Sequence, residues 1–295
     1  MNRRSFLLTL PIAGSAVAAD ANAPDLSLGV IADPQYADKP TAGSRHYRAS
    51  IGKLKQCVNE LNRRPLNAVV TLGDFIDEQF ESFEPINAIY ADLKPDHLKV
   101  PGNHDFSVAA EKKGEVLGAL GLERGYSSWV IGSYRIVLLD GTEVSPYRPE
   151  HADTARKWMA RLRKDGRKNG QPYNGGLSET QFAWLEKELE SATSAKERVI
   201  LCCHYPVLPE DPHNLWNDRE VVALIDDSPC VVAWFNGHNH KGNYATRNGC
   251  HYVNFKGMVE TADRTAYAIV RCYPNRIEIE GFDSEPDRKL GEFRR

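Results

Sequence analysis

Short apolar runs alternate with longer segments of helical periodicity along the chain. Several runs have the length and composition of buried β-strands: 26–32, 68–72, 97–100, 199–203 and 231–235. Further short strands are expected at 128–130, 134–139, 251–255, 266–270 and 276–279. Apolar positions at helical spacing predict helices at 44–62, 83–93, 153–162 and 220–225, and one starting at Ser178. This alternation predicts an α/β sandwich with mixed sheets in one domain.

Two local features refine this pattern. Ser178 and Gln181 have the spacing of a capping box, which marks the start of a helix. Residues 143–177 are polar and weakly patterned apart from their one helix-like piece. Insertions of this length are more often functional than part of a core.

Polar side chains follow five of the strand-like runs, at the point where each run ends. Because the carboxyl ends of strands in α/β sheets form ligand sites, these side chains are expected to converge. His238 and His240 are spaced i, i+2, so both can point the same way from an extended segment. The clusters are Asp33 with Gln35, Asp74 after Gly73, Asn103-His104-Asp105 after Gly102, His204, and His238 with His240 after Gly237.

This ordered set resembles the calcineurin-like metallophosphoesterases, whose pattern is D-x-H, G-D, G-N-H-D/E, H, G-H-x-H. Gln35 stands where most of that superfamily has histidine. The segments 32–38, 173–178 and 257–262 resemble a narrower group, the manganese-dependent ADP-ribose/CDP-alcohol diphosphatases. The resemblance implies a four-layer sandwich, with two central mixed β-sheets flanked by helices, in a domain spanning 26–288.

The resemblance also implies a site for two divalent metal ions. Two such ions, about 3.5–4 Å apart, clamp the attacking and leaving oxygens in phosphoryl transfer. The amide of Gln35 makes its site harder than an imidazole would, which favours Mn²⁺, with Fe²⁺ or Zn²⁺ as alternatives. One ion would be held by Asp33, Gln35, Asp74 and His240, and the other by Asp74, Asn103, His204 and His238, with Asp74 bridging.

The same resemblance implies that a hydroxide shared by the two ions attacks phosphorus. His104 follows the ligand Asn103, so its side chain is expected to face the substrate and to assist the leaving oxygen. Asp105 is expected to orient His104. The alternative for His104 is a structural hydrogen-bonding role. The other histidines, His46, His97, His151, His213 and His251, are expected to be ordinary surface or core residues.

Two segments are candidates for substrate binding. Arginine can pair with phosphate and tyrosine can stack on a base, which favours the segment at the first long helix. A glycine loop before a helix can direct backbone N–H groups at a phosphate. The alternatives are a solvated helix start and a flexible loop. The candidate residues are Arg45, Tyr47, Arg48, Tyr173, Asn174 and Gly175.

Composition limits the class of partner. The chain of 295 residues has a net charge of −3, so it has no general basic excess to attract nucleic acid. A small phosphorylated, nucleotide-like substrate would be captured by the metals and a few arginines. The expected function is cleavage of the pyrophosphate bond in ADP-ribose or CDP-alcohol type substrates. The alternatives are a broad phosphodiesterase or phosphomonoesterase on the same site, and a non-catalytic metal-binding scaffold.

Residues 1–23 are typical of an export signal. Arg3 and Arg4 precede an apolar run at 6–19, and an A-x-A pattern predicts cleavage after Ala18. The paired arginines resemble a twin-arginine signal, which implies transient contact with that export machinery and a periplasmic or extracellular location. A stable membrane anchor is the disfavoured alternative, because the run is shorter than about 20 residues and contains Pro11.

Six cysteines become relevant in an oxidising compartment. Cys202 and Cys203 lie in a strand-like run and are expected to be small buried residues. Cys250 and Cys272 lie on successive strand-like runs and could form a disulfide across a hairpin. Six cysteines allow fifteen full pairings, among which the sequence does not choose.

Overall fold

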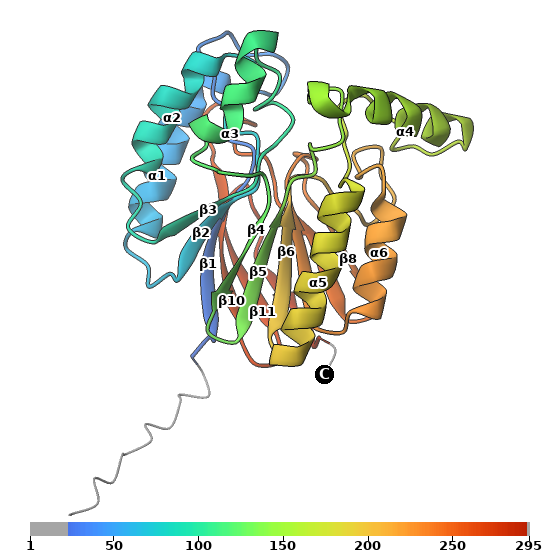
Figure 1. Cartoon of the computed structure of the whole chain (residues 1–295). Coiled ribbons are helices and arrows are strands. Elements are labelled where there is room, and N and C mark those ends of the chain that lie inside the picture. The colour runs from blue at the N-terminus through green and yellow to red at the C-terminus, as the bar shows by residue number, and fades with distance from the viewer. Residues whose placement is uncertain (1–22, 294–295) are drawn as a thin grey trace, which may run out of the picture.

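Two six-stranded sheets packed face to face form the centre of the protein (Figure 1). The structure is a computed structural model, and it describes residues 23–293. The expected export signal therefore lies outside the described residues, apart from Ala23. Among the described helices, none has the length and apolar character needed to cross a membrane.

The first sheet is parallel at one side and antiparallel at the other. β1 pairs in parallel with β2, and β2 with β3, whereas β10 runs antiparallel to β1. In order across the sheet, its strands are β12 (Arg288–Leu290), β11 (Ile277–Asp283), β10 (Ala266–Cys272), β1 (Leu26–Ile31), β2 (Ala68–Thr71) and β3 (Asp96–Lys99).

The second sheet has a parallel centre and antiparallel edges. Its four central strands pair in parallel, and β4 and β8 each run antiparallel to their neighbour. In order, the strands are β4 (Ser127–Ile131), β5 (Tyr134–Leu139), β6 (Arg198–Cys203), β7 (Val231–Asn236), β9 (Cys250–Asn254) and β8 (Asn243–Arg247).

Helices cover the outer face of each sheet, which completes four layers. On the first sheet lie α1 (Ser50–Leu61), α2 (Phe83–Tyr90) and α3 (Val116–Ala119), and on the second α5 (Glu179–Ala195) and α6 (Asp218–Asp227). A further helix, α4 (Ala152–Lys164), extends from one side of the body (Figure 1). Short 3₁₀ turns occupy Tyr47–Ala49, Phe80–Ser82, Ala110–Glu115 and Pro149–His151.

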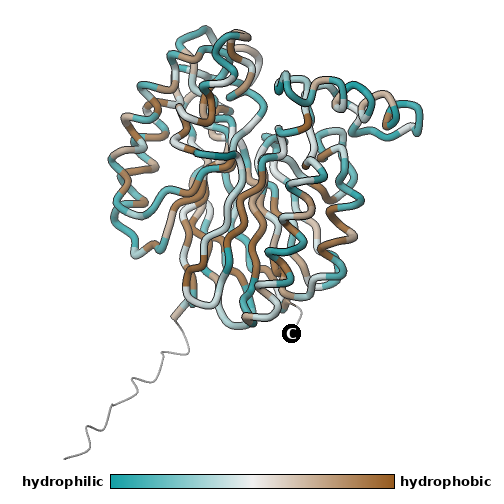
Figure 2. Tube along the Cα trace, viewed as in Figure 1, coloured by the Kyte–Doolittle hydropathy of each residue, from teal (hydrophilic) through white to brown (hydrophobic). Residues whose placement is uncertain are grey.

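Three apolar layers hold these elements together. Val30 and Phe235 pack in the layer between the sheets, Leu54 in the layer under α1, and Leu185 in the layer under α5. The central strands β1, β2, β6 and β7 are buried on both faces, so their sequences read as continuous apolar runs, seen in brown in Figure 2. The four-layer sandwich with two mixed sheets is confirmed.

Several local expectations are also confirmed. Oγ of Ser178 accepts a hydrogen bond from the backbone N–H of Gln181 at 3.1 Å, so Ser178 caps α5 as its spacing predicts. Cys202 and Cys203 are fully buried in β6. The sequence-based expectations did not include β8, β12 or α3, which are short or lie at sheet edges.

The first long helix begins later than predicted, at Ser50 instead of 44. Arg45 pairs with Glu260 in an isolated β-bridge, and the backbone N–H of His46 donates to the carbonyl of Val259 at 2.9 Å. These contacts hold the segment in an extended conformation, so helical periodicity alone misplaced the start.

The proposed disulfide between Cys250 and Cys272 is wrong. None of the six cysteines, all within the described residues, forms a disulfide, and the two strands do not form a hairpin. Cys250 belongs to β9 in the second sheet, whereas Cys272 belongs to β10 in the first sheet. The chain crosses from one sheet to the other after β9. Cys250 and Cys272 are therefore separated, although their strands follow each other in the sequence.

Thiol titration of the full chain tests this arrangement. Protein unfolded in guanidinium without reductant is expected to show six reactive thiols per chain. The native protein should expose Cys230 at most, because the other five are buried and burial raises thiol pKa values. Finding four thiols in the unfolded, unreduced protein, with six after reduction, would establish a disulfide and contradict the structure.

Candidate metal centre

The polar clusters predicted from the sequence meet at one edge of the two sheets. Asp33, Gln35, Asp74 and Asn103 follow strands of the first sheet, and His204, His238 and His240 follow strands of the second. Among the described residues, potential ligand side chains form two groups. Within each group, the ligand atoms lie within 4.8 Å of one another. One group is Asp74, His204 and His238, and the other is Asp33, Asp74 and His240. Asp74 belongs to both groups, as a bridging ligand would.

The group around His204 is tightly packed. Its Nε2 lies 3.3 Å from Oδ2 of Asp74 and 3.1 Å from Oδ1 of Asn103. Nδ1 of His238 lies 3.2 Å from the same Nε2. A carboxylate, an amide oxygen and two imidazole nitrogens therefore converge on one point.

The group around Asp33 contains two polar atoms without a partner. Nε2 of Gln35 donates to Asp74 at 2.9 Å, but Oε1 of Gln35 is buried with no hydrogen bond within the described chain. Nε2 of His240 is likewise buried without a hydrogen bond and lies 3.4 Å from Oδ1 of Asp33. Buried polar atoms are rarely left unpaired, so these two fit a cation as their missing partner. The residues present therefore fit the expected metal ions.

The backbone is strained at four of the candidate ligand residues. Asp33, Gln35, Asp74 and His238 have positive φ values of 48°, 41°, 54° and 66°. Non-glycine residues in this region cost of order ~1–3 kcal/mol each and cluster at functional sites. Neighbouring glycines leave room for the ligands: a Cβ at Gly73 would lie 2.6 Å from Nδ1 of His204.

Each of the three candidate ligand histidines has a partner on its other ring nitrogen. Nδ1 of His204 donates to the carbonyl of Leu72 at 2.8 Å. Nε2 of His238 donates to Oδ1 of Asn174 at 3.0 Å, and Nδ1 of His240 lies 2.7 Å from Glu260. These partners set the tautomer of each ring and turn the free nitrogen towards the cluster.

Without bound ions, the charges in the cluster shift several pKa values. Burial would lower the pKa of His204, but the nearby charge and hydrogen bond of Asp74 raise it to about 9. In His240, burial is likewise outweighed by Asp33 and Glu260, and its pKa is also about 9. Burial and the charge of His204 hold the pKa of His238 well below its usual value. Burial opposes ionisation of Asp74, but the surrounding histidines lower its pKa overall.

His104 lies beside this cluster, and its side chain is 19% exposed. Its backbone N–H donates to Oδ1 of Asp74 at 2.8 Å, and its ring Nδ1 is in close contact with the carboxylate of Asp77. Burial raises the pKa of Asp77, but the hydrogen bond with His104 and the charge of Lys39 outweigh it and lower the pKa. Asp77 also pairs with Lys39.

The expectation that Asp105 orients His104 is not met. The carboxylate of Asp105 is fully buried and accepts hydrogen bonds from the backbone N–H groups of Phe75, Ile76 and Gly102. Burial and the charge of Asp74 raise its pKa to about 7. Asp105 therefore ties together two ligand-bearing loops, and Asp77 takes the orienting position.

Only two of the candidate substrate-binding residues remain available at the centre. The ring of Tyr173 lies 5.9 Å from the ring of His238 and is only half-buried. Arg45 is half-buried, and its charge acts on His240 and Glu260.

The other four candidates have structural partners. Tyr47 is 4% exposed and packs against Ala37 and Val259, so its ring cannot stack on a base. Arg48 is exposed and pairs with Asp38 at 2.6 Å.

Asn174 and Gly175 belong to the wall behind the centre. Asn174 is fully buried, with its amide nitrogen donating to the carbonyls of Asn169 and Pro212 and its oxygen accepting from His238. Gly175 is buried, and the backbone N–H groups of the three residues after it already donate to protein acceptors. The loop therefore positions a candidate ligand and does not present a row of free N–H groups to a phosphate.

Sequence reasoning missed several residues around the centre. Asp77 lies three positions after Asp74 in the same loop, and Glu260 lies in the segment 257–262. Lys53 is buried and donates to the carbonyls of Glu260 and Thr261, each at 3.1 Å, so it holds that segment in place. His213, expected to be an ordinary residue, has its ring 5.4 Å from that of His238. No pattern in the sequence around His213 indicates this position.

Comparison with known proteins agrees with this geometry. A model of the family described as calcineurin-like phosphoesterase matches residues 26–242. A rice (Oryza sativa subsp. japonica) protein named manganese-dependent ADP-ribose/CDP-alcohol diphosphatase is 28% identical, with 95% of this chain and 98% of the relative covered. A Homo sapiens protein of the same name is 27% identical, with 89% and 91% covered. A dimetal phosphatase from Danio rerio has a similar fold, with a TM-score of 0.82, 24% identity, and coverage of 91% of this chain and 99% of that chain.

Replacing Asn174 tests whether its side chain positions His238 or contacts the substrate. Asn174→Ala removes the acceptor for Nε2 of His238, so Mn²⁺ affinity should fall by roughly 10–100-fold, as it does for other outer partners of metal ligands. The KM for a chromogenic phosphodiester at saturating Mn²⁺ should stay unchanged. Tyr173→Ala, next to it, is the matched control and should raise KM without changing Mn²⁺ affinity. A higher KM with unchanged metal affinity for Asn174→Ala would place Asn174 in contact with substrate.

Metal binding should release protons at neutral pH. With pKa values of about 9, the rings of His204 and His240 are both positively charged at pH 7 when no ion is bound. Each ion needs the neutral imidazole of its own group, so loading both groups should release about two protons at pH 7 and almost none above pH ~10. The affinity for the metal ions should accordingly rise with pH up to about 9. Titration calorimetry in buffers of different ionisation enthalpy measures the number of protons released. If no proton is released at pH 7, His204 and His240 are not the metal ligands.

Proposed function

The chain belongs to the calcineurin-like phosphoesterase family, and we propose that it hydrolyses the pyrophosphate bond of nucleoside diphosphate-linked substrates. As a family member with diphosphatase-named relatives, it is a metal-dependent hydrolase of phosphoric esters or anhydrides. The proposed substrates are of the ADP-ribose or CDP-alcohol type, which are the ones in the names of those relatives. The observation that carries the proposal is the position of Asp74 in both ligand groups.

Two divalent ions are proposed to be held by the groups that share Asp74. When bound, such ions lower the pKa of water and neutralise charge on the phosphoryl oxygens. Mn²⁺ is proposed first, because the donors combine carboxylate and amide oxygens with imidazoles and include no thiolate. The names of the relatives also include manganese.

His104 is proposed to act on the leaving oxygen. Its ring is partly exposed beside the ligand groups, and its contact with Asp77 fixes the orientation of the ring. The Asp77 carboxylate accepts from Nδ1–H and so fixes the ring, and the opposite nitrogen would donate to the phosphoryl group or the departing oxygen when it also carries a proton. Lys39 pairs with Asp77 and keeps its carboxylate charged.

Arg45 and Tyr173 are proposed to bind the rest of the substrate. The Arg45 guanidinium can pair with a second phosphate, and the half-buried Tyr173 ring can contact a ribose or base. They approach the centre from different segments, Arg45 ahead of α1 and Tyr173 ahead of α5. An extended diphosphate substrate could therefore touch both.

A second candidate function uses the same ions with simpler substrates. Tyr47 and Arg48 are engaged by the protein itself, which leaves few side chains to select a nucleotide. This observation favours a broader phosphodiesterase or phosphomonoesterase. The third hypothesis, a non-catalytic scaffold, is wrong, since family membership and the diphosphatase-named relatives establish a hydrolase.

Export through the twin-arginine route is part of the proposal. It rests on Arg3, Arg4 and the apolar run at 6–19, with cleavage after Ala18 and a mature hydrolase domain at 26–288. That route carries folded proteins, which suits an enzyme that takes up its metal before it leaves the cytoplasm.

A substrate panel with Mn²⁺ tests the proposed function. ADP-ribose, CDP-choline, bis-p-nitrophenyl phosphate and p-nitrophenyl phosphate are compared by kcat/KM, and one of the two diphosphates is expected to exceed both nitrophenyl esters by at least about tenfold, or ~1.4 kcal/mol of transition-state binding. Asp74→Asn should abolish activity on all four, whereas the exposed Asp38→Asn should retain it. Preference for the nitrophenyl esters would favour the broader phosphoesterase.

A further inference from the structure

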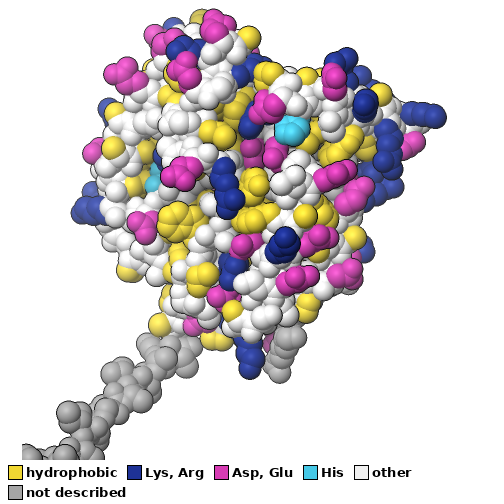
Figure 3. Space-filling model, in the orientation of Figure 1, with side chains coloured by type: hydrophobic (Ala, Val, Ile, Leu, Met, Phe, Trp, Pro, Cys, Tyr) yellow, Lys and Arg dark blue, Asp and Glu magenta, His cyan; other side chains and the backbone are white. Residues whose placement is uncertain are grey.

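Helix α4 carries a concentrated positive charge in a chain that is otherwise acidic. Residues 152–168 contain seven basic and two acidic side chains, whereas the whole chain has 37 basic and 40 acidic side chains. Figure 3 shows lysine and arginine side chains gathered at the side of the molecule where α4 extends in Figure 1. The excess positive charge is therefore a local feature.

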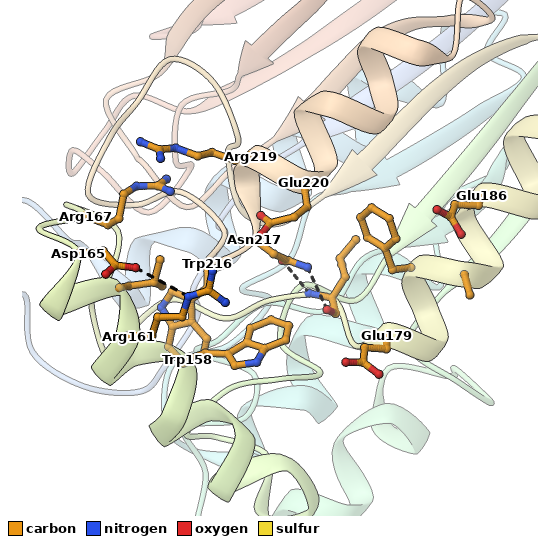
Figure 4. A pocket seen from close by; sticks show the side chains of 14 residues that line it. Trp158, Arg161, Asp165, Arg167, Glu179, Glu186, Trp216, Asn217, Arg219 and Glu220 are labelled. Carbon is orange, nitrogen blue, oxygen red and sulfur yellow. Dashed lines mark hydrogen bonds and ion pairs between the residues drawn. The ribbon is translucent and has the colours of Figure 1, made fainter.

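The two faces of α4 differ in what they contact. At 100° per residue, Ala155, Trp158, Met159 and Leu162 fall on one face, and this face packs with Val144 and Trp216. Figure 4 shows Trp158 beside Trp216 in the groove between α4, α5 and α6. The apolar face is thus turned towards the body of the protein, where Trp158 and Leu162 also line the groove.

The opposite face of α4 is basic and exposed. Lys157 and Lys164 lie near the middle of this face, with Arg156, Arg161 and Arg163 towards its margins. The ion pairs here are surface pairs, Arg156 with Asp153 and Arg161 with Asp165, and they neutralise only part of the charge. We call Arg156, Lys157, Arg161, Arg163 and Lys164 the basic face of α4.

We infer that the basic face of α4 docks the protein on an anionic lipid bilayer. A helix of 13 residues presents a row of positive charge about 20 Å long, which suits a flat anionic surface. The helix is about 10–12 Å thick, so it holds the acidic body roughly one Debye length from the lipid headgroups.

A bilayer fits this face better than a single-stranded nucleic acid does. Proteins that bind single strands combine basic side chains with aromatic rings on which the bases stack. The aromatic ring of α4, Trp158, is turned into the groove and is unavailable for stacking. Docking is therefore electrostatic and shallow, without insertion of the packed apolar face.

Docking would bring the metal centre close to the bilayer. After α4 the chain runs through 165–172 into Tyr173 and Asn174, which contact His238. α4 and the ligand groups therefore lie at the same edge of the sheets. Phosphorylated compounds at the lipid surface would have a short path to the centre.

Co-sedimentation of the full chain with vesicles tests the inference. The vesicles contain one part phosphatidylglycerol to three parts phosphatidylcholine, with pure phosphatidylcholine vesicles as the background. The test variant is Arg156→Gln, Lys157→Gln, Lys164→Gln. The matched control, Lys55→Gln, Arg63→Gln, Lys94→Gln, removes the same charges from exposed positions in α1 and in the loops that follow α1 and α2. The apolar run at 6–19 is present in every protein compared and contributes equally.

The expected results are specific to the basic face. The wild type and the control should bind the anionic vesicles alike, and the test variant about 100-fold more weakly, since each basic residue near the surface contributes about fivefold. Binding should fall steeply between about 0.05 M and about 0.5 M salt. Activity on a soluble substrate should be equal in all three proteins, which shows that each is folded.

Three results would overturn the inference. The first is equal binding by the test variant and the wild type, and the second is equal binding of the wild type to pure phosphatidylcholine vesicles. The third is stronger binding of the wild type to duplex DNA than to anionic vesicles at the same salt, which would assign the basic face to a nucleic acid. None of these outcomes depends on the identity of the hydrolysed substrate.

Discussion

The buried carboxylate of Asp74 is the constraint on which the functional edge of the protein depends. Asp74 is fully buried, and its oxygens lie next to His204, Gln35 and the backbone of His104. Removing a carboxylate from water is costly unless charge or hydrogen bonds compensate. In the chain without ions, protonated histidines provide that compensation, and bound cations would take it over. The positive φ of Asp74 and the close approach of Gly102 to its side chain follow from bringing so many groups to one carboxylate.

Local sequence patterns predicted the ligand loops but not the contacts around them. A polar side chain that follows an apolar run is visible within a few residues, which is why the sequence predicted that Asp74, His204 and His238 would converge, as they do in the structure. Asp105 adjoins His104 in sequence, yet its carboxylate turns back to the backbone of its own loop and of the neighbouring one. Asp77 reaches His104 from another loop, and only the folded arrangement shows this.

The remaining misses share a physical cause, which is packing between distant segments. Tyr47 is buried because Val259, more than 200 positions away, packs on it. The helix after it starts late because the same distant segment pairs with residues 45 and 46. Cys250 and Cys272 are separated because the chain changes sheets between β9 and β10. Periodicity and composition describe one segment at a time, so they carry no information on these pairings.

The placement of the candidate ligands would give bound ions a structural role as well as a chemical one. Asp33, Asp74 and Asn103 come from the first sheet, and His204, His238 and His240 from the second. An ion held by ligands from both sheets must be released when the sheets separate, so its binding energy adds to the stability of the sandwich. At a concentration 100 times the dissociation constant, one ion adds about 2.7 kcal/mol to the free energy of unfolding. That gain is of the same order as the ~1–3 kcal/mol that one residue with a strained backbone costs. The metal centre therefore offsets part of the strain that its own assembly introduces.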